Sequence, residues 1–325
     1  MTVVVPCRNE VMTVGAVVEG FRGELPRARI VVADNRSSDA TAEAALAAGA
    51  EVIHVPIAGK GRAVRRLAEL CVSDVVVMVD GDSTYDPSVA RQLVHLVCCL
   101  GYDLVNVARD ETARTDGEAY RIGHRAGNVA LGSLQRTLTG IELRDILSGY
   151  KAMSRRFVTS MPIRSQGFAL EVEIAAHAVA LDLAYCEITA PYAARPPGSV
   201  SKLATYRDGL HILRMITRLH RDLHPFAAFA SMSVPWFAGS VALGFRPIDD
   251  YVSTGHVPHY PSLIASGALF IVGMLVLMSG WLLERVARMR RDLLQLTAND
   301  MERSMLLARA AVDPEQAVGV ARPDR

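Results

Sequence analysis

An uninterrupted run of five apolar residues, 75–79, leads directly into Asp80-Gly81-Asp82. A short apolar run of this kind is typical of a strand that is buried on both faces, as in a parallel sheet. Ligands of open α/β sheets bind at the carboxyl ends of strands, which is where these two carboxylates stand. Two hard oxygen ligands one residue apart suit Mg²⁺ or Mn²⁺, ions that usually accompany substrate phosphates. The motif therefore indicates a metal-bound nucleotide or diphosphate, although Asp-Gly-Asp is also a common turn sequence.

The first 110 residues repeat this order of strand and helix. Strands are predicted at residues 2–5, 29–33, 51–55, 74–79 and 103–108, and helices at 11–21, 38–48, 61–70 and 87–99. After residue 118 the pattern changes, with helices predicted at 118–138 and 169–181, a loop with strand character at 145–151 and a strand at 184–190. Repeated β-α-β units predict an α/β fold, in which a mostly parallel sheet carries helices on both faces.

The C-terminal part of the chain has the composition of a membrane anchor. Residues 225–245 and 262–283 contain no charged residue, and about twenty residues suffice to cross about 30 Å of hydrocarbon. Buried core helices are the alternative interpretation. Arginines flank the pair on both outer sides, which places both termini in the cytoplasm by the positive-inside rule. The basic helix predicted at 202–224 fits an anionic membrane surface or an ordinary basic surface.

These patterns predict four regions. They are a cytoplasmic α/β domain over residues 1–201, an amphipathic juxtamembrane helix over 202–224, two transmembrane helices within 225–284, and a cytoplasmic tail over 285–325 that is partly disordered after about residue 297. The expected location is the inner (plasma) membrane.

Charge and cysteine content exclude several other classes. The net charge is +1, which provides no electrostatic case for nucleic-acid binding. The five cysteines are odd in number and include no Cys-x-x-Cys pair, which argues against a disulfide framework or a zinc site and fits a reducing compartment.

Four polar segments stand in the predicted strand-to-helix connections, so they converge on one edge of the sheet. They are Pro6-Cys7-Arg8-Asn9-Glu10, Asp34-Asn35-Arg36-Ser37-Ser38-Asp39, Gly59-Lys60-Gly61 and Asp80-Gly81-Asp82. Together these segments resemble the family 2 glycosyltransferases, which have a GT-A fold. The resemblance implies a nucleotide-sugar donor bound by Pro6, Arg8, Asn9, Glu10, Asp34, Asn35, Ser37, Lys60, Asp80 and Gly81. In that interpretation Asp34 faces the base, Lys60 approaches the diphosphate, and Asp80 and Asp82 hold Mg²⁺ or Mn²⁺.

The downstream sequence sharpens the resemblance. Residues 145–151, with Ser154-Arg155 and a later block that includes Glu171, Glu173 and Tyr192, are similar to dolichyl-phosphate mannose synthases and related polyprenyl-phosphate glycosyltransferases. The resemblance implies catalytic roles for Asp82, Arg109, Asp145 and Arg195, and an acceptor-phosphate site made of Arg109, Arg121, Arg125, Lys151, Arg195, Ser201 and Lys202. Two departures are Thr84, where those enzymes usually have glutamine, and Tyr150-Lys151, which replaces the commoner Phe-Arg.

The function that follows is inverting transfer of a hexose from a GDP- or UDP-linked sugar to polyprenyl phosphate at the cytoplasmic membrane face. A polyprenyl phosphate is already ionised, so its oxygen needs little help from a general base. One alternative is another lipid acceptor, such as a diacylglycerol or ceramide hydroxyl, for which Asp145 or the Glu171/Glu173 pair would have to serve as base. A second alternative is a non-catalytic, membrane-tethered nucleotide-binding adaptor. Homo-oligomerisation remains open.

Overall fold

The computed structural model describes residues 1–70, 73–110, 140–161, 163, 169–193, 217–218 and 220–312. The chain divides into two compact units. The first comprises Met1–Gly209 and Leu293–Arg325, and the second comprises Leu210–Asp292.

The first unit is built on a seven-stranded sheet with strand order β3-β2-β1-β4-β6-β5-β7. The strands are β1 (Thr2–Cys7), β2 (Arg29–Asp34), β3 (Glu51–His54), β4 (Val75–Met78), β5 (Leu104–Asp110), β6 (Lys151–Ser154) and β7 (Tyr185–Pro191). β6 runs antiparallel to both β4 and β5, and the other pairs are parallel. The predicted α/β class is therefore confirmed. Because β6 reverses direction between β4 and β5, those two strands point the same way and their carboxyl ends share one edge.

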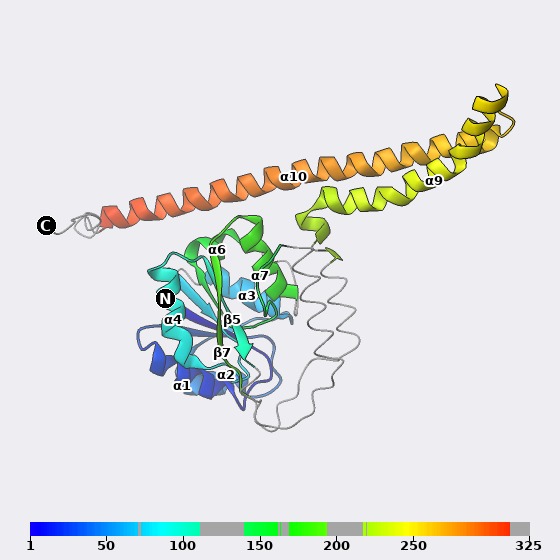
Figure 1. The fold of residues 1–325 in the computed structure, drawn as a ribbon. Coiled ribbons are helices and arrows are strands. Elements are labelled where there is room, and N and C mark those ends of the chain that lie inside the picture. The colour runs from blue at the N-terminus through cyan, green and yellow to red at the C-terminus, as the bar shows by residue number, and fades with distance from the viewer. Residues whose placement is uncertain are drawn as a thin grey trace. The chain divides into compact units, whose positions relative to one another are not determined.

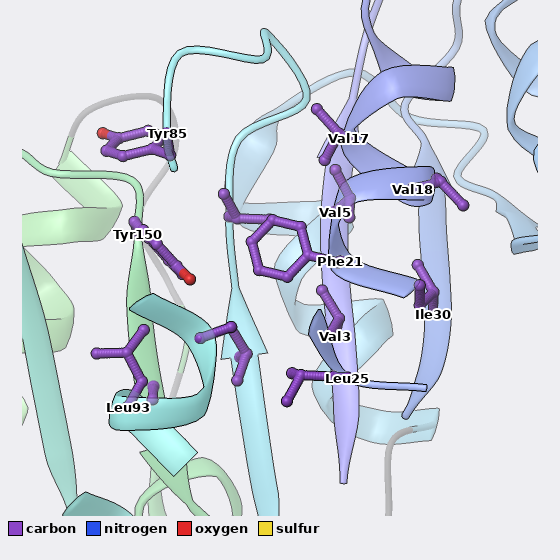
Figure 2. Close-up of a cluster of buried hydrophobic side chains, with 14 of the residues drawn as sticks. Val3, Val5, Val17, Val18, Phe21, Leu25, Ile30, Tyr85, Leu93 and Tyr150 are labelled. Carbon is purple, nitrogen blue, oxygen red and sulfur yellow. The ribbon is translucent and has the colours of Figure 1, made fainter. Parts of the chain in front are cut away.

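Helices cover both faces of this sheet (Figure 1). They are α1 (Val14–Glu24), α2 (Thr41–Ala47), α3 (Lys60–Leu70), the 3₁₀ turn η1 (Pro87–Val89), α4 (Ala90–Cys98), α6 (Arg155–Ser160) and α7 (Ala169–Ala180). Side chains of each strand alternate between two cores. Val3 and Val5 of β1 pack with Phe21 of α1 (Figure 2), whereas Val4 packs with Leu67 of α3. Burial on both faces explains why these strands are continuously apolar.

Two helices begin later than the sequence predicts, for local hydrogen-bonding reasons. The carbonyl of Glu10 accepts from the backbone N–H groups of Thr13 and Val14, so α1 starts after a turn. Asp39 precedes α2 rather than lying in its first turn, and its carboxylate accepts from the backbone N–H of Thr41 at 3.2 Å. Short polar side chains commonly satisfy the free N–H groups at helix starts in this way.

The second unit is a helical hairpin. It contains α9 (Pro225–Thr254) and the first part of α10 (Tyr260–Val312). The Ser266 hydroxyl donates to the carbonyl of Ser240 at 2.7 Å, and the rings of Phe237 and Phe270 meet edge to face at 5.5 Å. Both helices are long and apolar enough to cross a membrane, with mean hydropathy of 1.5 and 2.2.

Both hairpin helices extend beyond the predicted apolar spans. α9 continues through Arg246 and the two acids Asp249 and Asp250, which shortens the predicted 246–261 connection. α10 continues to Val312, so the expectation of a partly disordered tail is wrong up to that residue. The sequence explains the extension, because residues 284–312 contain neither Gly nor Pro and the next proline is Pro314. Residues 118–138, and 202–216 of the predicted juxtamembrane helix, lie outside the described residues.

Candidate active site

The Asp80-Gly81-Asp82 turn follows β4 at the carboxyl edge of the sheet. The Thr13 hydroxyl donates to the Gly81 carbonyl at 2.6 Å, which fixes the turn against the segment before α1. Asp82 is buried, and its Oδ1 accepts from the Thr84 hydroxyl at 2.6 Å and from the Thr84 N–H at 3.3 Å. Thr84 thus directs its hydroxyl to Asp82. The Asp80 side chain is 29% exposed, so it is the more accessible carboxylate.

Lys60 places a cation against this turn. It is the first residue of α3, and its Nζ lies 2.5 Å from Asp80 Oδ1 and 2.6 Å from Glu171 Oε1. Burial alone would lower the pKa of Lys60, but the charges of Asp80 and Glu171 outweigh burial and raise that pKa above its ordinary value. Lys60 is therefore a permanent ammonium, and it ties α3 to both β4 and α7.

A glycine packs directly against Asp80. A Cβ added to Gly149 would lie 2.1 Å from Asp80 Oδ2, so a larger residue there would require the Asp80 carboxylate to move. The Gly149 N–H donates to the Tyr85 hydroxyl at 2.8 Å, which holds this loop in place. Burial, followed by the charge of Asp80, raises the pKa of Tyr85 above its ordinary value, so the phenol stays protonated. Sequence reasoning missed Tyr85, whose signal was its position three residues after the acidic motif.

The predicted donor-binding segments after β1 and β2 meet at the same edge. The Asn35 amide accepts from the Gly59 N–H at 2.7 Å and donates to the Gly59 carbonyl at 3.1 Å, which links β2 to the residue before Lys60. Asn9 adopts a positive φ of 53° and accepts from the Ser38 N–H at 2.8 Å. Asp34 is buried and accepts from the Ser37 N–H at 3.2 Å.

The remaining residues of the first segment lie beside these groups. Pro6 is within β1, Arg8 is exposed just after the strand, and the N–H of Glu10 donates to Thr41 Oγ1 at 2.9 Å. The structure therefore brings the four predicted segments together at one edge of the sheet.

Arg109, near the end of β5, forms a two-point ion pair with Asp145. Its Nε donates to Oδ2 at 2.6 Å and its Nη2 donates to Oδ1 at 2.8 Å, and its guanidinium lies 5.4 Å from the centre of the Tyr192 ring. Burial would lower the pKa of Arg109, but its hydrogen bonds to Asp145 raise it, so the guanidinium stays charged. Such bidentate pairs fix both position and orientation of the arginine.

Lys151 does not lie where an acceptor phosphate would reach it. Its side chain is fully buried in β6, and its Nζ donates to the side-chain oxygen of Asn106 and, at 3.4 Å, to the Ile146 carbonyl. Burial lowers the pKa of Lys151 to about 8. The predicted direct contact between Lys151 and an acceptor is therefore not supported, because the ammonium has no exposed surface.

Buried Asn106 and half-buried Glu187 complete this network, and the sequence analysis predicted neither. The Asn106 amide donates to Glu187 at 2.6 Å and to the Asp145 carbonyl at 2.9 Å. The available signal was one polar residue within the otherwise apolar run 104–108.

Five predicted acceptor residues lie outside the described residues: Arg121, Arg125, Arg195, Ser201 and Lys202. The chain that leads to Arg195 is described as far as Ala193, whose N–H donates to the Thr84 carbonyl at 2.9 Å. Tyr85 and Tyr192 also form an isolated antiparallel bridge. The segment before Arg195 is thus anchored beside the Asp82 turn.

Solved structures share this fold. Glucosyl-3-phosphoglycerate synthase from Mycobacterium tuberculosis, in complex with Mn²⁺, UDP-glucose and phosphoglyceric acid, superposes with a TM-score of 0.53 at 24% identity, over 67% of this chain and 79% of that one. The same enzyme with Mn²⁺, UDP and glucosyl-3-phosphoglycerate gives a TM-score of 0.52 at 26% identity, over 67% and 77% of the two chains. The mixed sheet is therefore a GT-A-like fold.

Sequence comparison gives the family. The family model for Glycosyl transferase family 2 matches residues 2–161. Glycosyltransferase AglJ from Haloferax volcanii is 30% identical over 291 residues, which cover 89% of this chain and 94% of AglJ. Protein RfbJ from Shigella flexneri is 41% identical over 125 residues, 38% of this chain and 95% of RfbJ. With its fold, its acidic turn and these relatives, the chain belongs to the family 2 glycosyltransferases.

Proposed function

We propose that this protein transfers a hexose from a UDP- or GDP-linked sugar to polyprenyl phosphate at the cytoplasmic face of a membrane, with inversion at the sugar. The observation that carries the proposal is the Asp80-Gly81-Asp82 turn, set at the carboxyl edge of the sheet in a chain that also contains an apolar hairpin. The related glucosyl-3-phosphoglycerate synthase binds UDP-glucose with Mn²⁺. We extend the donor class and the divalent metal to this chain on that basis.

The residues of the acidic turn fit Mg²⁺ or Mn²⁺. Asp80 and Asp82 supply hard oxygen donors, which these ions prefer. Among the described residues there is no group of three His, Cys, Asp or Glu side chains that could hold a metal by itself. A site with two carboxylates suits Mg²⁺, which usually takes its remaining ligands from substrate phosphates and water. When bound, the ion supplies positive charge to the leaving diphosphate.

The protein's own groups position and neutralise the reactants. Lys60 provides an ammonium next to the acidic turn for the donor diphosphate, and Asp34 faces the base in our proposal. Arg109 stands at the end of β5, which shares the carboxyl edge with β4, and Asp145 orients its guanidinium. Arg109, together with Arg195 and either Arg121 or Arg125, is proposed to hold the acceptor phosphate. Such positioning and charge neutralisation are the main requirements when the nucleophile is already an anion.

The hairpin supports a lipid acceptor. Most of the exposed large apolar side chains of the described residues lie on α9 and α10, among them Val241, Phe245, Ile264 and Leu275. Only 11% of each apolar window is buried within the protein. An exposed apolar surface of this kind needs a covering partner, and a lipid bilayer matches the uncharged stretches of the two helices, residues 225–245 and 262–283.

A hydroxyl acceptor is less compatible with the site. Transfer to a hydroxyl would require a general base, for which the sequence offers Asp145 and the Glu171/Glu173 pair. Asp145 is engaged by Arg109, and Glu171 is engaged by Lys60. Both carboxylates are thus already held by a cation from the protein, which leaves them poorly placed to take a proton from an acceptor hydroxyl.

The test is a transfer assay with purified full-length protein in detergent. A panel of labelled UDP- and GDP-sugars is incubated with polyprenyl phosphate or with diacylglycerol, and the lipid product is extracted and counted. We expect label in the polyprenyl-phosphate arm alone, lost with EDTA and restored by Mg²⁺ or Mn²⁺. Asp82→Asn should abolish transfer, whereas Asp86→Asn, which preserves a helix cap, should not. Label only in diacylglycerol, or full activity of Asp82→Asn in chelator, would contradict the proposal.

A further inference from the structure

Lys60 bridges two carboxylates that differ in their surroundings. Its Nζ lies 2.5 Å from Asp80 Oδ1 and 2.6 Å from Glu171 Oε1. The two distances are nearly equal, yet the Glu171 side chain is 1% exposed and that of Asp80 is 29% exposed. The environment of each partner therefore decides which contact is easier to give up.

Glu171 depends on Lys60 far more than Asp80 does. The second oxygen of Glu171, Oε2, is buried and has no hydrogen-bond partner among the described residues. A buried carboxylate that loses its counter-charge is strongly destabilising. Asp80 is reached by solvent, which compensates for the loss of an ion pair there. Lys60 is thus anchored by Glu171, and its contact with Asp80 is the exchangeable one.

We propose that Lys60 is a placeholder cation on Asp80. Its ammonium neutralises the carboxylate that the metal would use. When a divalent cation arrives with the nucleotide diphosphate, Lys60 exchanges Asp80 for a phosphate oxygen and keeps its contact with Glu171. This inference rests on the metal and donor sites of the proposed function and adds an order to their filling.

The exchange has a thermodynamic consequence. A metal that binds alone must displace the ammonium from Asp80 without giving it a new partner, so it binds weakly. A metal that binds with a diphosphate provides that partner, so each ligand strengthens the other. By linkage, metal and nucleotide must raise each other's affinity by the same factor. Lys60 is therefore predicted to make donor-free metal binding weak and joint binding strong.

The test measures the Mn²⁺ affinity of the full-length protein in detergent, by the EPR signal of free Mn²⁺, without nucleotide and with UDP, or with GDP if UDP has no effect on the parent. Lys60→Met should tighten Mn²⁺ binding without UDP by about tenfold or more, and the gain in affinity on adding UDP should shrink. Arg66→Gln is the matched control, because Arg66 lies on the same helix and pairs with exposed Glu69 at 3.2 Å. This control should bind Mn²⁺ as the parent does.

A second pair of variants covers the case in which Lys60→Met fails to fold because Glu171 loses its counter-charge. Glu171→Gln removes the buried carboxylate. The double variant Lys60→Met/Glu171→Gln then lacks both that carboxylate and the Lys60 ammonium. Without UDP, the double variant should bind Mn²⁺ about tenfold tighter than Glu171→Gln alone. If the parent binds Mn²⁺ with nucleotide, but the double variant binds it no more tightly than Glu171→Gln does, the placeholder role of Lys60 is overturned. A parent that binds no Mn²⁺ with either UDP or GDP would overturn the metal site of the proposed function itself.

Discussion

At the scale of single residues, the site depends on close approach between backbone and carboxylate. Gly149 leaves room for the Asp80 carboxylate, which occupies the space that a Cβ would take, and the Tyr85 hydroxyl accepts from the Gly149 N–H. The glycine thus sets where the more exposed carboxylate of the acidic turn lies. A larger residue at Gly149 is therefore expected to reduce sugar transfer more than it reduces stability, because the strain falls on the Asp80 side chain.

Gly149→Ala is predicted to displace Asp80 and to lower sugar transfer about 100-fold, since a shift of about 1 Å in a catalytic group has effects of that size. Overpacking should also cost about 1–3 kcal/mol of unfolding free energy. Gly15→Ala is the control, because nothing lies within 4 Å of its added Cβ in α1. That change should leave transfer intact and stabilise the helix by about 0.5–1 kcal/mol. Full transfer by Gly149→Ala would show that Asp80 needs no fixed position.

Arg109→Ala is predicted to raise the KM for polyprenyl phosphate about 10- to 100-fold with donor affinity little changed. The loss corresponds to about 1.5–3 kcal/mol for a charge-assisted contact. Arg109→Lys should recover only part, because a point charge replaces the planar fork that now meets Asp145. Initial rates at varied acceptor concentration measure the effect.

Arg29→Ala is the control for Arg109→Ala. It also removes an arginine, but the exposed ion pair of Arg29 with Glu51 contributes little to stability. A change in donor KM instead of acceptor KM would place Arg109 on the donor side.

At the scale of elements, β6 is the strand that departs from the parallel pattern. It lies between β4 and β5 and carries Lys151 into the interior, where Asn106 and the Ile146 carbonyl receive its ammonium. Asn106 in turn donates to the carbonyl of Asp145, the partner of Arg109. The buried lysine therefore supports the position of the Arg109–Asp145 pair instead of contacting substrate.

The buried lysine predicts a pH dependence of stability. Burial lowers the pKa of Lys151 from 10.5 to about 8 in the folded protein, so between these values the unfolded chain binds the proton that the folded chain has released. The free energy of unfolding should therefore rise with pH from about 8 to 10.5, by about 3 kcal/mol, and this contribution is lost as pH falls through 8. Lys151→Met should remove that rise. Urea unfolding followed by circular dichroism at stepped pH measures the difference between parent and variant, and equal slopes would contradict the prediction.

At the scale of the whole molecule, the chain combines a GT-A-like unit with an apolar hairpin. The hairpin helices contact each other through small and aromatic residues, and Ser240 and Ser266 satisfy each other's polar groups. Arg285, Arg288, Arg290 and Arg291 follow the apolar part of α10. In our proposal these arginines remain in the cytoplasm with the donor site.

A topology experiment tests that orientation. A fluorescent reporter fused after Arg325 should be active in the cytoplasm, and alkaline phosphatase inserted after Gly255 should be active outside it. Gly255 suits the insertion because it ends α9 in a left-handed conformation, with φ of 73°. The reverse pattern would separate the donor site from cytoplasmic nucleotide sugars and contradict the proposed function.

The sequence by itself determined the features that depend on neighbouring residues. The alternation of apolar strands with helices predicted the α/β class, the acidic turn after residue 79 identified the edge of the site, and two uncharged spans predicted the hairpin helices. These signals are local, because the period of side-chain exposure and the absence of charge are readable within twenty residues.

Only the tertiary structure decided which charges meet and which are hidden. Lys60 and Glu171 are 111 residues apart in the chain, and Arg109 and Asp145 are 36 apart, so no local pattern predicted either pair. The sequence alone could not distinguish Lys151 from a phosphate-binding surface lysine, and the antiparallel insertion of β6 buried it. The physical reason is that the charge state and exposure of a side chain depend on what packs against it, and those partners come from distant segments that only the fold brings together.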